Sequence, residues 1–190
     1  DRSVKFWTPD GRLLRTITTS TLAPRIALSR DDSMVLTTGA NGILELWSVS
    51  GQRLRSFPRL DAPMLYAAAF APDQSYVVGC THAGRSDYCQ LFDLNGQPLA
   101  RLDNPGQGKG SAVAVAVSPD GQSLYTASNQ SVIKWKRNGE RIKEFRVTEN
   151  FVSTLVLSPD GSRLATASLF NSRTRGQKQG GEEPHTVILD

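Results

Sequence analysis

The chain has 190 residues, of which 38% are hydrophobic and 21% charged, with a formal net charge of +4. This composition is typical of a folded domain rather than of a disordered segment. No apolar run reaches the roughly 18 residues of a membrane helix, and no signal peptide is recognisable at the start of the chain.

Short strand patterns separated by turns follow one another along the chain. The chain opens with apolar alternation at 4–7 and 12–17, joined by Asp10-Gly11. Further strands are predicted near 25–29, 34–38, 43–48 and 53–57, and again within 66–102 and 112–146. The last region, 151–168, resumes at 186–189 after a polar, Gly-rich insertion at 169–184. No helical pattern of useful length occurs, so the sequence predicts an all-β fold of about 17 strands.

Two kinds of turn recur in alternation. The first is Ser118-Pro119-Asp120-Gly121, and it returns around Asp160, Asp73 and, in altered form, Asp31. The second has glycine in its second position, as in Asn138-Gly139, and is preceded by an aromatic residue. These aromatics are Trp7, Trp47, Phe92 and Trp135, which are 40, 45 and 43 residues apart. A fixed period of this length indicates repeated supersecondary units, here with four antiparallel strands each.

The repeated pattern of Ser-Pro-Asp-Gly, strand, Ala-Ser, Asp or Asn, strand ending in Trp, and Asn-Gly resembles the WD-repeat β-propellers of the bacterial type. The resemblance covers the whole chain except 169–184. It implies blades around a central axis, usually seven in a ring. It also implies that residues 1–17 end one blade, that 24–57, 65–102 and 112–146 are full blades, and that 151–190 is a partial blade.

The chain departs from the family pattern at several repeat positions. The family's Gly-His is absent, and the Asp six residues before the Trp is kept only as Asp1. Asn41 and Asn129 replace that Asp in two other copies. The buried network of Asp, His, hydroxyl and Trp that the family builds in each blade is therefore expected to be partial. With four to five blades in the chain, we expect a segment of a larger ring, completed by the same polypeptide or by a second copy.

The residues with reactive or metal-binding side chains form no recognisable site. His82 and His185 are the histidines of the chain, and neither has a metal-ligand spacing. We therefore expect no catalytic residue, no cofactor and no metal. Cys80 and Cys89 lie on neighbouring strands of one hairpin, so that contact is possible, but two reduced thiols are the favoured interpretation.

Charge is distributed unevenly over the expected blades. The connections between blades, together with those from second to third strands, carry six basic and six acidic residues. The basic excess lies on the outer strands, where it commonly prevents edge-to-edge pairing. The outer basic residues are Arg12, Arg15, Arg53, Arg55, Arg101, Arg141, Lys143 and Arg146. Binding of nucleic acid by this basic rim remains an alternative, and we regard it as the less favoured one.

The sequence thus favours a non-catalytic scaffold or sensor that binds a protein or peptide through loops of one face. The predicted contact residues are Arg59, Arg85, Asp87, Lys109, Arg173, Arg175 and Lys178. The family resemblance further implies a cytoplasmic module of a larger bacterial signalling protein. An alternative is a propeller that gates or supports an attached hydrolase or protease domain.

Overall fold

A computed structural model describes residues 2–20, 22, 25–40, 42–81, 88–103, 112–128, 130–147, 151–169 and 186–189. These residues form seventeen strands and no helix. Accordingly, the described part of the chain contains no helix that is long and apolar enough to cross a membrane. The all-β class predicted from the sequence is confirmed.

The strands form five antiparallel sheets, numbered here in chain order. The first sheet contains β1 (Ser3–Trp7) and β2 (Leu13–Thr18), and the second β3 (Ile26–Leu28), β4 (Met34–Thr38), β5 (Leu44–Ser48) and β6 (Arg53–Ser56). The third contains β7 (Leu65–Phe70), β8 (Tyr76–Thr81), β9 (Tyr88–Asp93) and β10 (Pro98–Asp103). The fourth contains β11 (Ala112–Val117), β12 (Ser123–Ser128), β13 (Ser131–Lys136) and β14 (Arg141–Arg146). The fifth contains β15 (Phe151–Leu157), β16 (Leu164–Leu169) and β17 (Thr186–Leu189).

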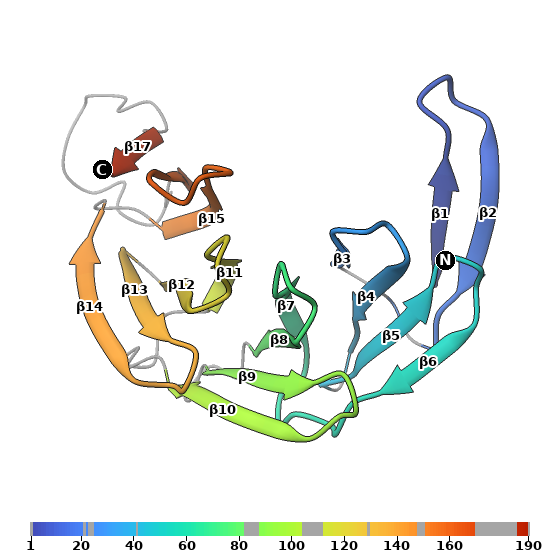
Figure 1. The fold of residues 1–190 in the computed structure, drawn as a ribbon, viewed down its shortest axis with the longest axis horizontal. Coiled ribbons are helices and arrows are strands. Elements are labelled where there is room, and N and C mark those ends of the chain that lie inside the picture. Colours follow the sequence, from blue (N-terminus) through green and yellow to red (C-terminus); the bar gives the residue numbers. More distant parts are fainter. Residues whose placement is uncertain are drawn as a thin grey trace, which may run out of the picture.

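The sheets follow one another along an arc, with the first and fifth sheets at its two ends (Figure 1). Strands β3, β7, β11 and β15 lie on the concave side, and β6, β10 and β14 lie on the convex side (Figure 1). The concave strands contact their neighbours, since β7 contacts β3 and β11, and β11 contacts β15. The expected blade-like sheets of four antiparallel strands are therefore confirmed. The described residues form this open arc, and a ring of seven blades stays a prediction.

Apolar side chains fill the spaces between successive sheets. Phe57 and Phe92, for example, lie 5.4 Å apart by ring centroids in the cluster between the second and third sheets. Tyr76 is fully buried between the third and fourth sheets, and its hydroxyl donates a hydrogen bond to the carbonyl of Gly121 at 3.0 Å. Each sheet therefore buries its apolar faces against its neighbours, as a repeat array must.

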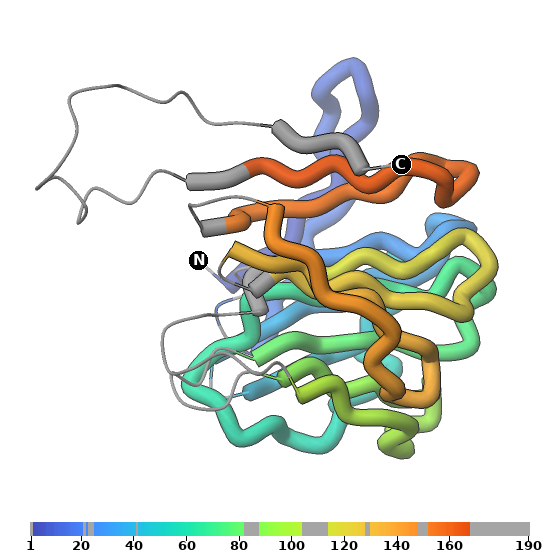
Figure 2. Tube along the Cα trace, turned by 90° about the vertical axis from the view of Figure 1, so that its left-hand side faces the viewer, coloured from blue at the N-terminus to red at the C-terminus, as the bar shows by residue number. Residues whose placement is uncertain are grey.

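The turns between first and second strands share a hydrogen bond from the amide two residues on to the Asp carboxylate. Asp120 accepts bonds from the Ser118 hydroxyl at 2.5 Å and from the Gln122 amide at 3.0 Å, while Gly121 has a φ of 69°. Left-handed backbone favours glycine, and Asp side chains commonly bond the backbone two residues on. These turns lie together on the right-hand side of Figure 2. The recurring sequence pattern thus specifies a recurring local structure.

The structure corrects the expectation that both cysteines are reduced thiols. Cys80 and Cys89 form a disulfide, rather than remaining as reduced thiols. They are paired directly across β8 and β9, with Cα atoms 4.0 Å apart, and both side chains are fully buried. The sequence places them on adjacent strands, but only the register of those strands brings them face to face.

Candidate protein-interaction surface

Of the predicted contact residues, Arg59 lies in the described part of the chain. It is exposed in the connection between β6 and β7. The other six predicted contacts, Arg85, Asp87, Lys109, Arg173, Arg175 and Lys178, lie outside the described residues.

The segment that carries Arg59 alternates exposed and buried residues. Leu60 and Ala62 are buried, whereas Arg59 and Asp61 are exposed. The Leu60 amide donates to the Gly42 carbonyl at 3.0 Å, and a methyl-sized group on Gly42 would collide with the Leu60 carbonyl oxygen. Only glycine therefore permits this close approach. The packing of Leu60 and Ala62 holds two opposite charges outward on a firmly anchored loop.

Tyr88 links this segment to the neighbouring hairpin. Its hydroxyl accepts a hydrogen bond from the Asp61 amide at 3.1 Å. The Arg101 guanidinium lies over the Tyr88 ring, 3.7 Å from its centroid, and pairs with Asp103 at 2.6 Å. A guanidinium stacked on an aromatic ring has little freedom to move. Asp61, Arg101 and Asp103 thus form a charged patch over the buried Tyr88, which we call the Tyr88 patch. Arg59 lies two residues before Asp61 in the same connection.

Sequence reasoning missed most of this patch. The sequence places Arg101 among the basic residues of the outer strands and Asp61 among the acidic residues of the connections, and it does not point to Tyr88. One sequence signal was present, because Tyr88 directly follows a lengthened connection at 81–87. Its contacts with Asp61 and Arg101 depend on the packing of two separate connections, which spacing in the sequence does not reveal.

The aromatic repeat residues have structural roles. The indole Nε1 of Trp135 donates to the Thr126 hydroxyl at 2.8 Å, and that of Trp47 donates to the Thr37 hydroxyl at 3.2 Å. Both pairs are buried. Phe92, which has no such donor, is fully buried against the second sheet. The partial network expected from the sequence is thus a Trp–Thr pair here, while Asp1, Asn41 and Asn129 lie outside the described residues.

The repeated turn aspartates are bound into their own turns. Hydrogen bonds from Ser158 and Ser162 lower the pKa of Asp160 to about 2. Serine hydroxyls and amides lower the pKa of Asp31, Asp73 and Asp120 in the same way. These carboxylates are committed to local bonds, which marks them as turn-forming residues.

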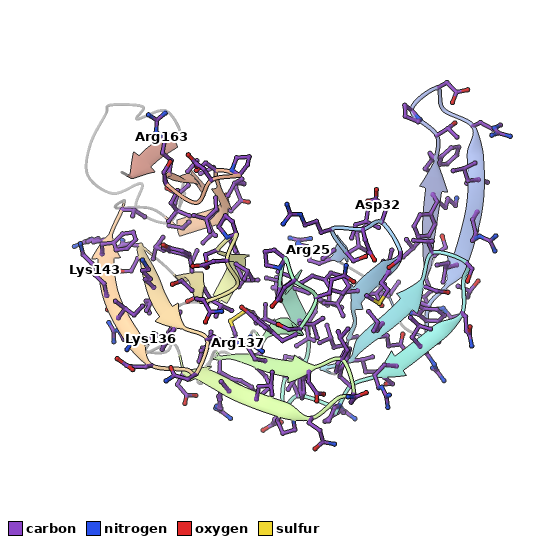
Figure 3. All side chains as sticks on the ribbon, in the orientation of Figure 1. Arg25, Asp32, Lys136, Arg137, Lys143 and Arg163 are labelled. Atoms are coloured by element: carbon purple, nitrogen blue, oxygen red, sulfur yellow. A yellow bond between two sulfur atoms is a disulfide. The ribbon has the colours of Figure 1, made fainter. Side chains whose placement is uncertain are left out.

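Many basic side chains of the outer strands already have partners. Arg53 pairs with the buried carboxylate of Glu45 at 3.2 Å, and Arg141 pairs with Glu144. Arg15 donates to the Ser50 carbonyl at 2.6 Å, which ties the first sheet to a turn of the second. Lys136 and Lys143 lie on the outer side of the fourth sheet (Figure 3), where Lys136 pairs with Glu140 at 2.8 Å. The rim is therefore less strongly positive than its arginine count suggests.

The described ranges contain no candidate metal centre. None of their His, Cys, Asp and Glu residues gather in groups of three or more that could hold a metal ion. What the Tyr88 patch offers instead is exposed charge of both signs, held in place over the buried Tyr88 ring, which is a property of a recognition surface.

A comparison with protein families gives a match to one model, described as WD domain, G-beta repeat, at residues 96–136. The matched segment begins in the turn before β10 and ends in β13, so it joins the outer strand of one sheet to three strands of the next. A search of curated proteins finds no match. WD repeats in general serve as scaffolds for protein interaction, and they are typically non-catalytic. Residues 96–136 thus match a WD repeat, which is consistent with the WD-repeat family that the sequence resembles.

Proposed function

We propose that this chain is a non-catalytic interaction module that binds a protein or peptide through the face carrying the Tyr88 patch. The observation that carries the proposal is the anchored segment 58–64, which holds Arg59 and Asp61 outward between buried Leu60 and Ala62. A rigid display lowers the entropy lost on binding. Arg85, Asp87, Lys109, Arg173, Arg175 and Lys178 remain proposed contacts on the same face.

The proposal extends to the cellular location of the module and to the domains attached to it. A cytoplasmic location within a larger bacterial signalling protein agrees with the family resemblance. In that setting, catalysis by a hydrolase or protease would belong to another domain. Binding of nucleic acid is a weaker candidate, because Arg53, Arg141 and Lys136 already pair with carboxylates.

The test uses a random peptide library displayed on phage, selected against the immobilised chain. Peptides enriched on the wild-type chain are then measured against the charge-swapped variant Arg59→Glu/Asp61→Lys. We expect at least about tenfold weaker binding, equivalent to about 1.4 kcal/mol. The matched control is Arg30→Glu/Asp32→Lys, a swap of the same net charge in the exposed turn between β3 and β4.

Two outcomes would count against the proposal. One is the absence of enriched peptides, and the other is equal loss of binding in both swapped variants. Nucleic-acid binding is measured separately with a labelled single-stranded oligonucleotide at low salt. Binding that weakens steeply with added salt would favour the basic rim instead.

A further inference from the structure

The third sheet joins its second and third strands by a covalent bond where its neighbours use a tryptophan hydrogen bond. In the second and fourth sheets, a tryptophan of the third strand donates to a threonine of the second strand. In the third sheet Phe92 stands at the tryptophan position and Gly79 at the threonine position. One register position further along, Cys80 on β8 is bonded to Cys89 on β9. The central cross-strand link of this sheet can therefore be opened by reduction.

The disulfide adjoins the residues that position the Tyr88 patch. Thr81 follows Cys80 on β8, and Tyr88 precedes Cys89 on β9. The Thr81 hydroxyl accepts a hydrogen bond from the Tyr88 amide at 3.0 Å and donates one to the Tyr88 carbonyl at 3.1 Å. Both residues are buried. The pair of Thr81 and Tyr88 thus continues the link between β8 and β9 directly from the disulfide.

Tyr88 in turn determines where the charged groups of the patch lie. Its hydroxyl accepts a hydrogen bond from the Asp61 amide, and its ring lies under the Arg101 guanidinium. Asp103 on β10 is registered opposite Tyr88 itself. A displacement of Cys89 is therefore passed through one neighbouring residue to all three members of the patch.

The packing around the sulfur atoms makes such a displacement the expected result of reduction. Cys80 and Cys89 are fully buried in one core cluster with Leu102 and Ile133. Two separate thiols need van der Waals space that a single disulfide does not occupy. Because a close-packed core has no spare space of this kind, the backbone shifts or side chains leave their preferred rotamers.

We propose that the disulfide of Cys80 and Cys89 is a redox-sensitive device that controls the Tyr88 patch. The oxidised chain holds the patch in its binding geometry, and reduction by a dithiol loosens the patch while the fold persists. The inference rests on the proposed function in one respect, which is that the Tyr88 patch belongs to the binding face.

The reduction is an ordinary thiol–disulfide exchange. A thiolate of the dithiol attacks one cysteine sulfur and releases the other cysteine as a thiolate, which takes up a proton. The second thiol of the dithiol then displaces the remaining cysteine, so that the dithiol becomes a disulfide and the chain gains two electrons and two protons. Because both sulfurs are buried, the exchange follows local opening of β8 and β9.

The first test needs no binding partner. Amide hydrogen exchange is measured by NMR on the oxidised chain and on the chain reduced with dithiothreitol, with the thiol state determined by alkylation and mass spectrometry. We expect the Asp61 and Tyr88 amides to exchange about tenfold faster after reduction, because their acceptors are no longer held in place. The Arg137 amide, which donates to the Gln122 carbonyl beside the fourth sheet, should exchange at an unchanged rate.

A matched variant separates the disulfide from other effects of the reductant. Cys80→Ala/Cys89→Val installs the pair that the fourth sheet has at these register positions, Ala127 and Val132. Its exchange rates should be the same with and without dithiothreitol.

The second test measures binding. Peptides selected on the oxidised wild-type chain should bind the reduced chain about tenfold more weakly, because the binding-competent patch is then populated only in part. Reoxidation should restore the affinity, and the double variant should bind equally with and without dithiothreitol. If the selection yields no peptide while Asp61 exchange responds to reduction, the redox device stands and the proposed function fails.

Four results would overturn the redox device. The disulfide stays closed when the folded chain is kept in dithiothreitol, or exchange at Asp61 is unchanged after complete reduction. Alternatively, the reduced chain loses its far-UV spectrum, so that the effect is unfolding rather than a change at the patch. Finally, selected peptides bind the oxidised and reduced chains equally well, which leaves the proposed function intact.

Discussion

At the scale of single residues, the Trp–Thr pair is present in the second and fourth sheets and absent from the third. Trp47 and Trp135 each have a threonine acceptor, whereas Phe92 has Gly79 at the corresponding position. A methyl-sized group on Gly79 would lie 3.2 Å from a Leu44 methyl of the second sheet. The third sheet therefore has neither the donor nor the acceptor, and close packing stands where the other sheets have the hydrogen bond.

Thr126→Val tests the contribution of this pair to stability. The substitution leaves the buried indole N–H of Trp135 without an acceptor, so we expect the free energy of unfolding to fall by about 1–3 kcal/mol. Urea unfolding followed by tryptophan fluorescence measures the change. Thr16→Val, on exposed β2, should change stability by less than about 0.5 kcal/mol. Equal effects of the two substitutions would mean that the hydrogen bond contributes nothing.

At the scale of elements, the turns between first and second strands make stability depend on pH. The folded-state pKa values of Asp120 and Asp160 lie below the ordinary value of 3.8, with that of Asp160 at about 2. The stability that these ionised carboxylates contribute is thus present above about pH 4. It is lost as the pH falls through the folded-state pKa values. We expect the urea midpoint to be level from about pH 6 to 5 and to fall between about pH 4 and 2. The double variant Asp120→Asn/Asp160→Asn should have a lower urea midpoint near neutral pH, and that midpoint should fall less at low pH. An equally steep fall in the variant would contradict this account.

The disulfide stabilises the hairpin of β8 and β9. Its closed loop is short, with a sequence separation of nine residues, and the chain-entropy relation gives about 2.5 kcal/mol of stabilisation for such a loop. The counterparts of the two cysteines in the next sheet are Ala127 and Val132. We therefore expect Cys80→Ala/Cys89→Val to fold with the same far-UV spectrum and to lose about that stability in urea.

The same disulfide bears on cellular location. Disulfides persist mainly in oxidising compartments, so the cytoplasmic location stays a prediction. In protein purified from its source and denatured with a thiol-blocking reagent present throughout, Cys80 and Cys89 should carry no blocking group. Blocking groups on both cysteines would show that the bond is absent in the cell.

At the scale of the whole molecule, each sheet is stabilised by its neighbours, so the ends of the arc are expected to be its least stable parts.

The number and order of sheets, their turns and the buried aromatic positions follow from the amino-acid sequence itself. Ser-Pro-Asp-Gly and Asn-Gly turns act through local backbone chemistry, and period-2 alternation determines which side of a strand is apolar. The resemblance to WD repeats rests on the same local pattern, and the family model matches residues 96–136.

Only the tertiary structure decided which side chains meet. Register brought Cys80 opposite Cys89, and the packing of two connections placed Tyr88 between Asp61 and Arg101. The physical reason is that contacts between sheets join residues far apart in sequence, while local propensity acts over a few residues.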